Sequence, residues 1–152
     1  MARGDVHVFA SYIKASKTGI GFNLATDTLK LGIVNNTTVP TVSAIDPRWG
    51  ASGTTDFSAN QVALATGYAA PVTLTSVAYN RVSGVVTLSA ANVAIPQDAS
   101  GFSNGYWAIL YDSTVAGNYA IGYVDLGGAV GNVSGALNIN WNASGIFTET
   151  AA

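Results

Sequence analysis

The residues that could do chemistry in this chain are few and lie far apart. His7 is the only histidine and there is no cysteine, which leaves no histidine-based triad, multi-histidine metal site, thiolate zinc site or cysteine nucleophile. The acidic residues contain no D-x-D-x-D-G calcium loop, and Gly19-Ile-Gly21 lacks the rest of a phosphate-binding fingerprint. We therefore expect a protein that is not an enzyme, with no catalytic residues, no cofactor and no metal ion.

The acidic residues have a structural interpretation instead. Asp27, Asp46, Asp98 and Asp112 stand at turn positions, where an Asp side chain commonly hydrogen-bonds its own backbone. A paired-carboxylate hydrolase would require the fold to bring two of them together, and their spacing does not indicate this. The pattern favours turn formation.

The aromatic residues of the second half raise a carbohydrate-binding platform as a possibility. Most of them fall inside predicted strands, where aromatic side chains are usually core or cross-strand partners. Core packing is therefore favoured for this group: Tyr106, Trp107, Tyr111, Tyr119, Tyr123 and Trp141.

Charge is scarce in this chain of 152 residues. Charged residues make up 9% of the sequence, the formal net charge is −2 and the six basic residues are scattered. Nucleic-acid binding needs a basic stripe, and a membrane span needs a longer unbroken apolar run, so neither partner is expected. The first residues lack the apolar core of a secretory signal, which favours a soluble protein made in the cytosol. Weak charge repulsion predicts ready association with other protein surfaces.

Strand signals dominate from about residue 28 onward. Alternating or continuous apolar runs separated by turn-forming residues occupy 28–34, 72–79, 85–89, 91–95, 105–111, 119–126, 135–141 and 146–148. Residues 72–89 predict a hairpin, with a bulge near Ser76 and a turn at 80–84. Seven or eight short strands without a long amphipathic helix predict an all-β fold, an antiparallel β-sandwich of the jelly-roll or immunoglobulin-like kind. We expect one domain over residues 1–152.

Two segments depart from this pattern. In the N-terminal arm, residues 1–19, apolar side chains recur at helical spacing and Gly19 could end a short helix, although a strand over 6–13 competes with this interpretation. Residues 37–68 are predicted as a long irregular loop, a feature that is often functional. Partner contacts are expected in both segments, at Arg3, Val8, Phe9, Tyr12, Arg48, Trp49 and Phe57. The alternative for Trp49 and Phe57 is that both fill the core.

Several motifs, in order, resemble a family of small virion structural proteins of tailed bacteriophages and prophages. They are Ile20-Gly-Phe-Asn-Leu-Ala-Thr-Asp-Thr-Leu-Lys-Leu31, Thr66-Gly-Tyr68, Trp107-Ala-Ile-Leu-Tyr-Asp112, Ile121-Gly-Tyr-Val-Asp-Leu-Gly-Gly128 and Leu137-Asn-Ile-Asn-Trp-Asn-Ala-Ser-Gly-Ile-Phe147. Val8-Phe-x-x-Tyr12 with Lys14 fits the family's start, and the likeness is weakest over residues 36–65. The resemblance implies a virion component and carries no active-site residues.

The leading expectation is a capsid decoration or cement protein in the phage particle. Its expected partners are the major capsid protein and neighbouring copies of itself, with a homo-oligomer, for example a trimer, as the natural arrangement. The first alternative is a tail, neck or baseplate component. The second is a carbohydrate-binding receptor-recognition module that uses exposed tyrosines and Trp49.

Overall fold

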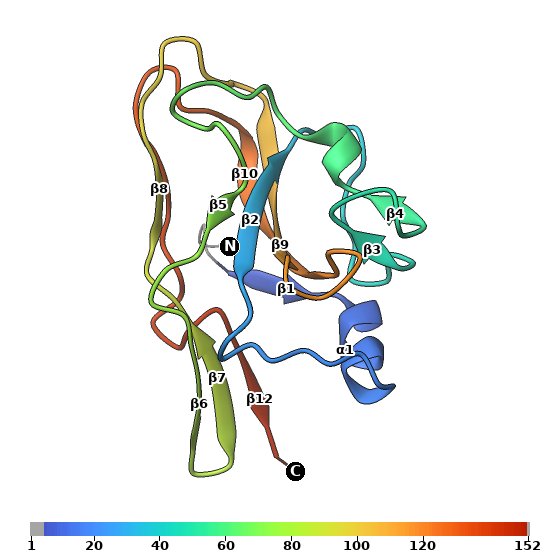
Figure 1. The fold of residues 1–152 in the computed structure, drawn as a ribbon. Coiled ribbons are helices and arrows are strands. Elements are labelled where there is room, and N and C mark those ends of the chain that lie inside the picture. Colours follow the sequence, from blue (N-terminus) through green and yellow to red (C-terminus); the bar gives the residue numbers. More distant parts are fainter. Residues whose placement is uncertain (1–4, 152) are drawn as a thin grey trace.

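Runs of aliphatic residues build a central antiparallel sheet in the computed structural model, which describes residues 5–151. Within that range, its five strands lie in the order β1-β10-β9-β2-β5 (Figure 1). They are β1 (Val6–Val8), β2 (Leu29–Val34), β5 (Val72–Thr73), β9 (Gly105–Asp112) and β10 (Ala120–Val130). β9 lies in the middle, which explains why its sequence is almost continuously apolar.

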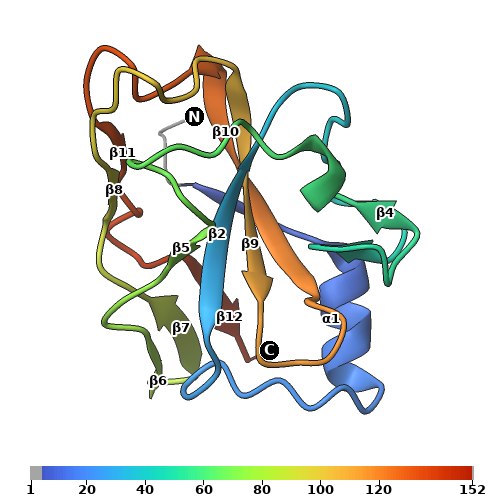
Figure 2. The same ribbon diagram turned by 45° about the horizontal axis from the view of Figure 1, so that its top comes forward.

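Two smaller antiparallel sheets lie beside the central one, where Figures 1 and 2 show β8, β11 and the β6–β7 hairpin on the side away from α1. One has the order β12-β7-β6 and the other pairs β11 with β8. Their strands are β6 (Ala78–Val82), β7 (Val85–Ser89), β8 (Val93–Ile95), β11 (Leu137–Ile139) and β12 (Phe147–Thr150). The predicted all-β, sandwich-like arrangement of antiparallel sheets is thereby confirmed.

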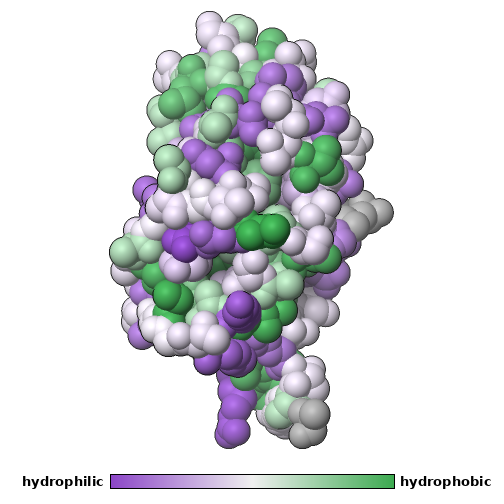
Figure 3. All heavy atoms as spheres, turned by 90° about the vertical axis from the view of Figure 1, so that its right-hand side faces the viewer, coloured by the Kyte–Doolittle hydropathy of each residue, from purple (hydrophilic) through white to green (hydrophobic). Residues whose placement is uncertain are grey.

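Residues 37–68, which we call the lobe, begin on the opposite side of the central sheet together with α1 (Ala10–Lys17) (Figure 1). After residue 60 the chain crosses to the side of β8, where the Gly67 N–H donates to Asp98. The lobe holds the parallel two-residue strands β3 (Pro47–Arg48) and β4 (Thr55–Asp56) and the 3-10 helix η1 (Ser58–Asn60). Figure 3 looks onto this side of the molecule and shows hydrophobic patches set among neutral and hydrophilic ones.

The N-terminal segment contains both structures that its spacing allows. β1 pairs with β10, and α1 begins at Ala10 after the buried Phe9. Gly19 has a φ of +99° just beyond the helix, as expected for a glycine at a helix C-terminus. The helix interpretation is confirmed, and the competing strand prediction over 6–13 holds only for Val6–Val8. From residue 5 onward, this segment is docked on the sheet and is not a free arm.

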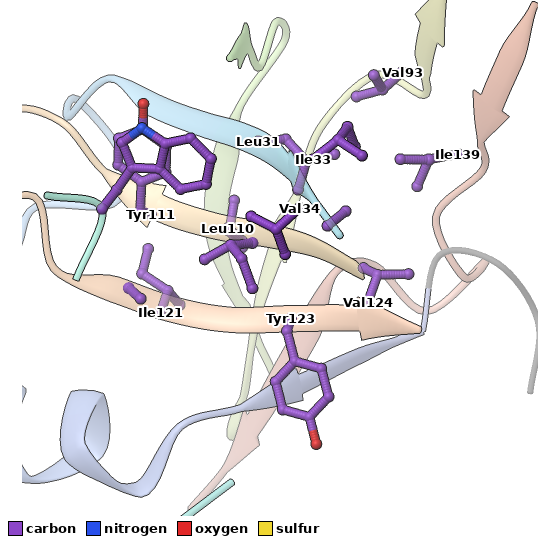
Figure 4. Close-up of a cluster of buried hydrophobic side chains, with 14 of the residues drawn as sticks. Leu31, Ile33, Val34, Val93, Leu110, Tyr111, Ile121, Tyr123, Val124 and Ile139 are labelled. Carbon is purple, nitrogen blue, oxygen red and sulfur yellow. The ribbon is translucent and has the colours of Figure 1, made fainter. Parts of the chain in front are cut away.

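The central sheet is buried on both faces. In Figure 4, Leu31 and Ile33 of β2 point toward Val93 and Ile139 of the small sheets, and all four side chains are buried. On the other face, the lobe covers Tyr111 of β9 and its neighbours. The lobe therefore forms a third layer, and its apolar residues complete the core.

The strand boundaries differ from the predicted ones at two places. The predicted strand 72–79 is divided into β5, which pairs with β2, and β6, which pairs with β7 in another sheet; Ser76 between them has a φ of +52°. The strand predicted over 119–126 extends as β10 to Val130, through an irregular register in which Gly127 and Gly128 both take positive φ. In the described part of the chain, no helix has the length and apolar character needed to span a membrane.

Candidate protein-contact surface

The aromatic residues predicted as partner contacts lie inside the domain. Phe9 and Phe57 are 0% exposed, Tyr12 is 5% exposed and Trp49 is 8% exposed. Phe9 stacks on Phe57 with ring centroids 5.8 Å apart and contacts Tyr123 at 5.3 Å. Their placement corrects the expectation of surface contacts, and for Trp49 and Phe57 the core alternative is the one found. Burial of rings this large stabilises the fold by about 1.5–3 kcal/mol each.

Trp49 enters the core through the space that Gly32 leaves on β2. A Cβ at position 32 would overlap the indole ring. The indole lies parallel to the Tyr111 ring, with centroids 5.1 Å apart and planes inclined by 3°. The backbone N–H of Trp49 donates to the Asn118 carbonyl, and the side-chain amide of Asn118 donates to the Trp49 carbonyl. These contacts anchor the lobe to the central sheet.

Arg48 is also held within the fold. It is 9% exposed, and its Nε donates to Asp46 Oδ1 at 2.8 Å. The guanidinium carbon lies 3.2 Å from the centroid of the Tyr119 ring, and Nη1 donates to the Gly117 carbonyl. Such a cation–π contact and ion pair neutralise the charge locally. The expectation of a partner contact at Arg48 is therefore wrong. Its side chain instead connects the lobe to the turn before β10.

The two remaining predicted contacts are placed differently. Val8 is half-buried in β1, opposite Gly122 of β10, and packs against the core. Arg3 lies outside the described residues, so its predicted contact stays a prediction.

The acidic residues mostly build loops, as their positions predict. Asp98 accepts the N–H groups of Gly67 and Ser100. Asp46 differs from the expectation, because its side chain binds Arg48 instead of its own backbone. The described residues contain no group of three or more histidine, cysteine or acidic side chains that could hold a metal ion.

Asp112 has the most perturbed carboxyl group. It is 0% exposed, and its Oδ1 accepts the N–H groups of Thr114 and Val115. Among the described residues its Oδ2 has no hydrogen-bond partner. Burial raises the pKa of Asp112 to about 6, and the neighbouring Asp27 carboxyl acts in the same direction. The Asp112 side chain therefore holds the turn that follows β9, and its burial leaves it no access to a substrate.

The exposed hydrophobic residues of the lobe are aliphatic, and sequence reasoning passed over them in favour of the aromatic ones. Among the described residues, four of the six large exposed hydrophobics belong to the lobe: Val39 52%, Val42 48%, Ile45 70% and Leu64 55%. No local signal in the sequence separates them from Val62, which stands in the same irregular segment and is 3% exposed.

Val42 and Ile45 lie beside α1. The N–H of Ala10 donates to the Val42 carbonyl, and the Ser11 hydroxyl donates to the Ala44 carbonyl at 2.8 Å. An open groove of about 350 Å³ separates the helix from the lobe, and it is lined by Lys14, Ala15, Thr18, Ile45, Asp46 and Tyr119. We call this groove, together with the exposed Val42 beside α1, the α1–lobe surface.

A second groove lies at the other side of the molecule, between β7 and the turn before β12. Its lining is neutral and mostly polar, with Thr87, Ser89, Asn92, Trp141, Asn142 and Ser144. The half-buried Trp141 is fixed there by its indole N–H, which donates to the Ala91 carbonyl, and by its backbone N–H, which donates to Asn92 Oδ1.

Comparison of the chain with protein-family models, with curated proteins and with solved structures finds no match to any of them.

Proposed function

We propose that this protein is a non-enzymatic structural component of a bacteriophage virion, a capsid decoration or cement protein that binds the outer surface of the major capsid lattice. It would bind through the α1–lobe surface. The observation that carries the proposal is the exposure of Val42 and Ile45 on a rigidly anchored lobe. Single aliphatic residues on a weakly charged surface provide modest contacts, which add up when many copies occupy a lattice.

The anchoring of the lobe supports this role. Trp49, Phe57 and Arg48 fix its backbone from inside, so the exposed aliphatic residues are held in place before binding. A pre-organised surface loses less conformational entropy on association than a mobile loop would. The resemblance to small virion proteins, which is weakest over residues 36–65, agrees with this role.

Binding to phage heads that lack the protein tests the proposal. The purified chain is expected to bind such heads, and Ile45→Asp is expected to reduce binding at least tenfold because it places a charge at the contact. Leu64→Asp is the matched control, since Leu64 is also exposed but lines no part of the groove. Absence of binding by the unmodified chain would overturn the proposal. Hundreds of copies per virion would agree with a head position, whereas six or twelve would indicate the neck or baseplate alternative.

Carbohydrate recognition is the second candidate, and the Trp141 groove is the observation that favours it. An indole beside neutral hydroxyl and amide groups suits the apolar face and hydroxyls of a sugar. Trp49, which the sequence suggested for this role, is buried. A glycan array tests the candidate, with binding expected for the unmodified chain and lost in Trp141→Ala. An array without any bound glycan removes it.

A further inference from the structure

The three-stranded sheet β12-β7-β6 has an open edge that projects from the body of the molecule. β6 pairs with β7 on one side only, and the β6–β7 hairpin extends beyond the central sheet (Figure 1). Asn80, Arg81 and Val82 are exposed, and Val82 reaches 71%. An uncovered strand edge offers unpaired backbone groups to another strand.

The hairpin geometry determines which backbone groups face outward. Val82 pairs with Val85 across a two-residue turn whose Ser83 and Gly84 have φ of +46° and +82°, as in a type I′ turn. In an antiparallel ladder, the residues next to such a turn bond across it, and the bonding direction alternates along the strand. Ala78, Asn80 and Val82 therefore bond inward to β7. Tyr79 and Arg81 direct their N–H and C=O groups to the open edge.

We propose that β6 is a self-association edge, at which it pairs antiparallel with β6 of a second copy around a two-fold axis at Asn80. Tyr79 then faces Arg81 of the second copy, and these pairs exchange the backbone hydrogen bonds. The exposed Val82 faces Ala78 of the second copy. The two sheets become one continuous six-stranded sheet, and the contact closes because it is isologous.

Charge selects this register and this partner. The Tyr79 hydroxyl donates a hydrogen bond to Glu149 Oε2 at 2.7 Å. The Tyr79 ring, which faces Arg81 of the second copy, therefore has the Glu149 carboxylate at its far end. A cation over a tyrosine ring with a carboxylate beyond it is a favourable arrangement. Shifting the register by two residues in one direction would place Arg81 opposite Arg81 of the second copy, and two like charges directly opposite each other are destabilising. The opposite shift would pair Arg81 with Val77, beyond the start of β6.

Pairing through the other edge is the competing arrangement. The backbone groups of Thr148 and Thr150 in β12 face outward. A symmetric β12–β12 pair centred on Glu149 would place its one charge opposite the same charge of the second copy. A β6–β12 contact between copies would be heterologous and would produce chains or rings instead of a dimer. These alternatives predict different cross-links.

Single-cysteine variants distinguish the edges, since the chain has no cysteine of its own. On the proposed axis, Asn80 faces Asn80 of the second copy as a non-hydrogen-bonded pair. In such pairs the two Cβ atoms lie about 4.5–5.5 Å apart, close enough for two cysteines to form a disulfide. We expect Asn80→Cys to form a disulfide-linked dimer under mild oxidation. The matched control, Thr148→Cys, lies in the same row of the same sheet at the opposite edge, and we expect it to form no disulfide-linked dimer. A disulfide-linked dimer from Thr148→Cys, or none from Asn80→Cys, would overturn the proposal.

Light scattering of the uncross-linked chain provides the second measurement. Arg81→Pro removes an outward N–H group, which an edge strand tolerates, so we expect loss of the dimer with unchanged circular dichroism. A dimer that persists in this variant contradicts the proposal. The inference deepens the proposed structural role, but both measurements use the isolated chain. Failure of self-association is therefore separable from failure to bind phage heads.

Discussion

Replacing Asp112 with Asn tests the energetics of the most perturbed group in the fold. Asp112 is fully buried, and its Oδ1 accepts two backbone N–H groups. An Asn side chain keeps that acceptor and has nearly the same shape as the protonated acid. Its amide can also donate toward Asp27, which the ionised carboxyl cannot do. We therefore expect Asp112→Asn to behave like the protonated form at every pH.

The magnitude follows from the raised pKa. Burial first, and then Asp27, raise the pKa of Asp112 from 3.8 to about 6, against the opposing N–H groups of Val115 and Thr114. This rise corresponds to about 3 kcal/mol of unfolding free energy. Because the folded protein binds this proton more tightly than the unfolded chain, the contribution is complete below pH 3.8 and is lost as the pH rises through 6. At pH 8, Asp112→Asn should be more stable than the unmodified protein by about 2–3 kcal/mol, and at pH 3.5 the two should be similar.

Urea unfolding between pH 3.5 and 8 measures this difference. The unmodified chain and Asp112→Asn share all other ionisable groups, so subtracting their unfolding free energies leaves the titration of Asp112 together with its interaction with Asp27. Asp27→Asn serves as the control: it retains an acceptor for the Asn23 N–H, removes the neighbouring charge and leaves Asp112 buried. It should therefore reduce the pH dependence without abolishing it. Parallel curves for the unmodified chain and Asp112→Asn, or a less stable Asp112→Asn at pH 8, would refute the reasoning.

Three further substitutions probe the anchoring of the loops. Phe57→Ala should lower the unfolding free energy by about 3–5 kcal/mol in urea, as for other buried phenylalanines, and a loss below 1 kcal/mol would mean that the ring is not a core residue. Gly32→Ala should displace the Trp49 indole, cost about 1–3 kcal/mol and alter the near-ultraviolet circular dichroism; an unchanged spectrum would contradict the stacking. Asp98→Asn should show the opposite pH dependence to Asp112→Asn. The backbone N–H groups that Asp98 accepts lower its pKa, so its contribution is present above pH 3.8 and is lost as the pH falls through the lowered value. If the unfolding free energies of Asp98→Asn and the unmodified chain converged at neutral pH instead of acid pH, this role of Asp98 would be excluded.

The strands were the most predictable part of the fold. Residues 85–89 alternate and form β7 with the expected bounds, and the apolar run from Gly105 forms the doubly covered β9. Hydrophobic periodicity reports which face a strand buries, and this depends on neighbours only weakly. Irregular points were less predictable, since Ser76 at positive φ and the glycine pair inside β10 depend on ladder partners far along the chain.

The contact residues were less predictable than the strands because local composition does not contain the packing partner. Trp49 sits among turn-forming residues, and nothing near it indicates that Gly32 leaves a space for its ring 17 positions earlier. Arg48 likewise finds Tyr119 across the fold. An aromatic residue in an irregular segment can therefore equally be a buried core residue or a partner contact. The aliphatic residues that remain outside are identified only once the core is known.

The use of charge within the fold connects these observations. Asp46 and Arg48 neutralise each other, Asp98 holds a loop and Asp112 is buried, so the surface carries even less charge than the composition suggests. Association through such a surface depends on backbone pairing and aliphatic contacts, which salt screens little. Arg81 is then significant as a cation on an otherwise open strand edge. A charge there suppresses indiscriminate pairing, and it permits the one register in which it meets a ring and a carboxylate.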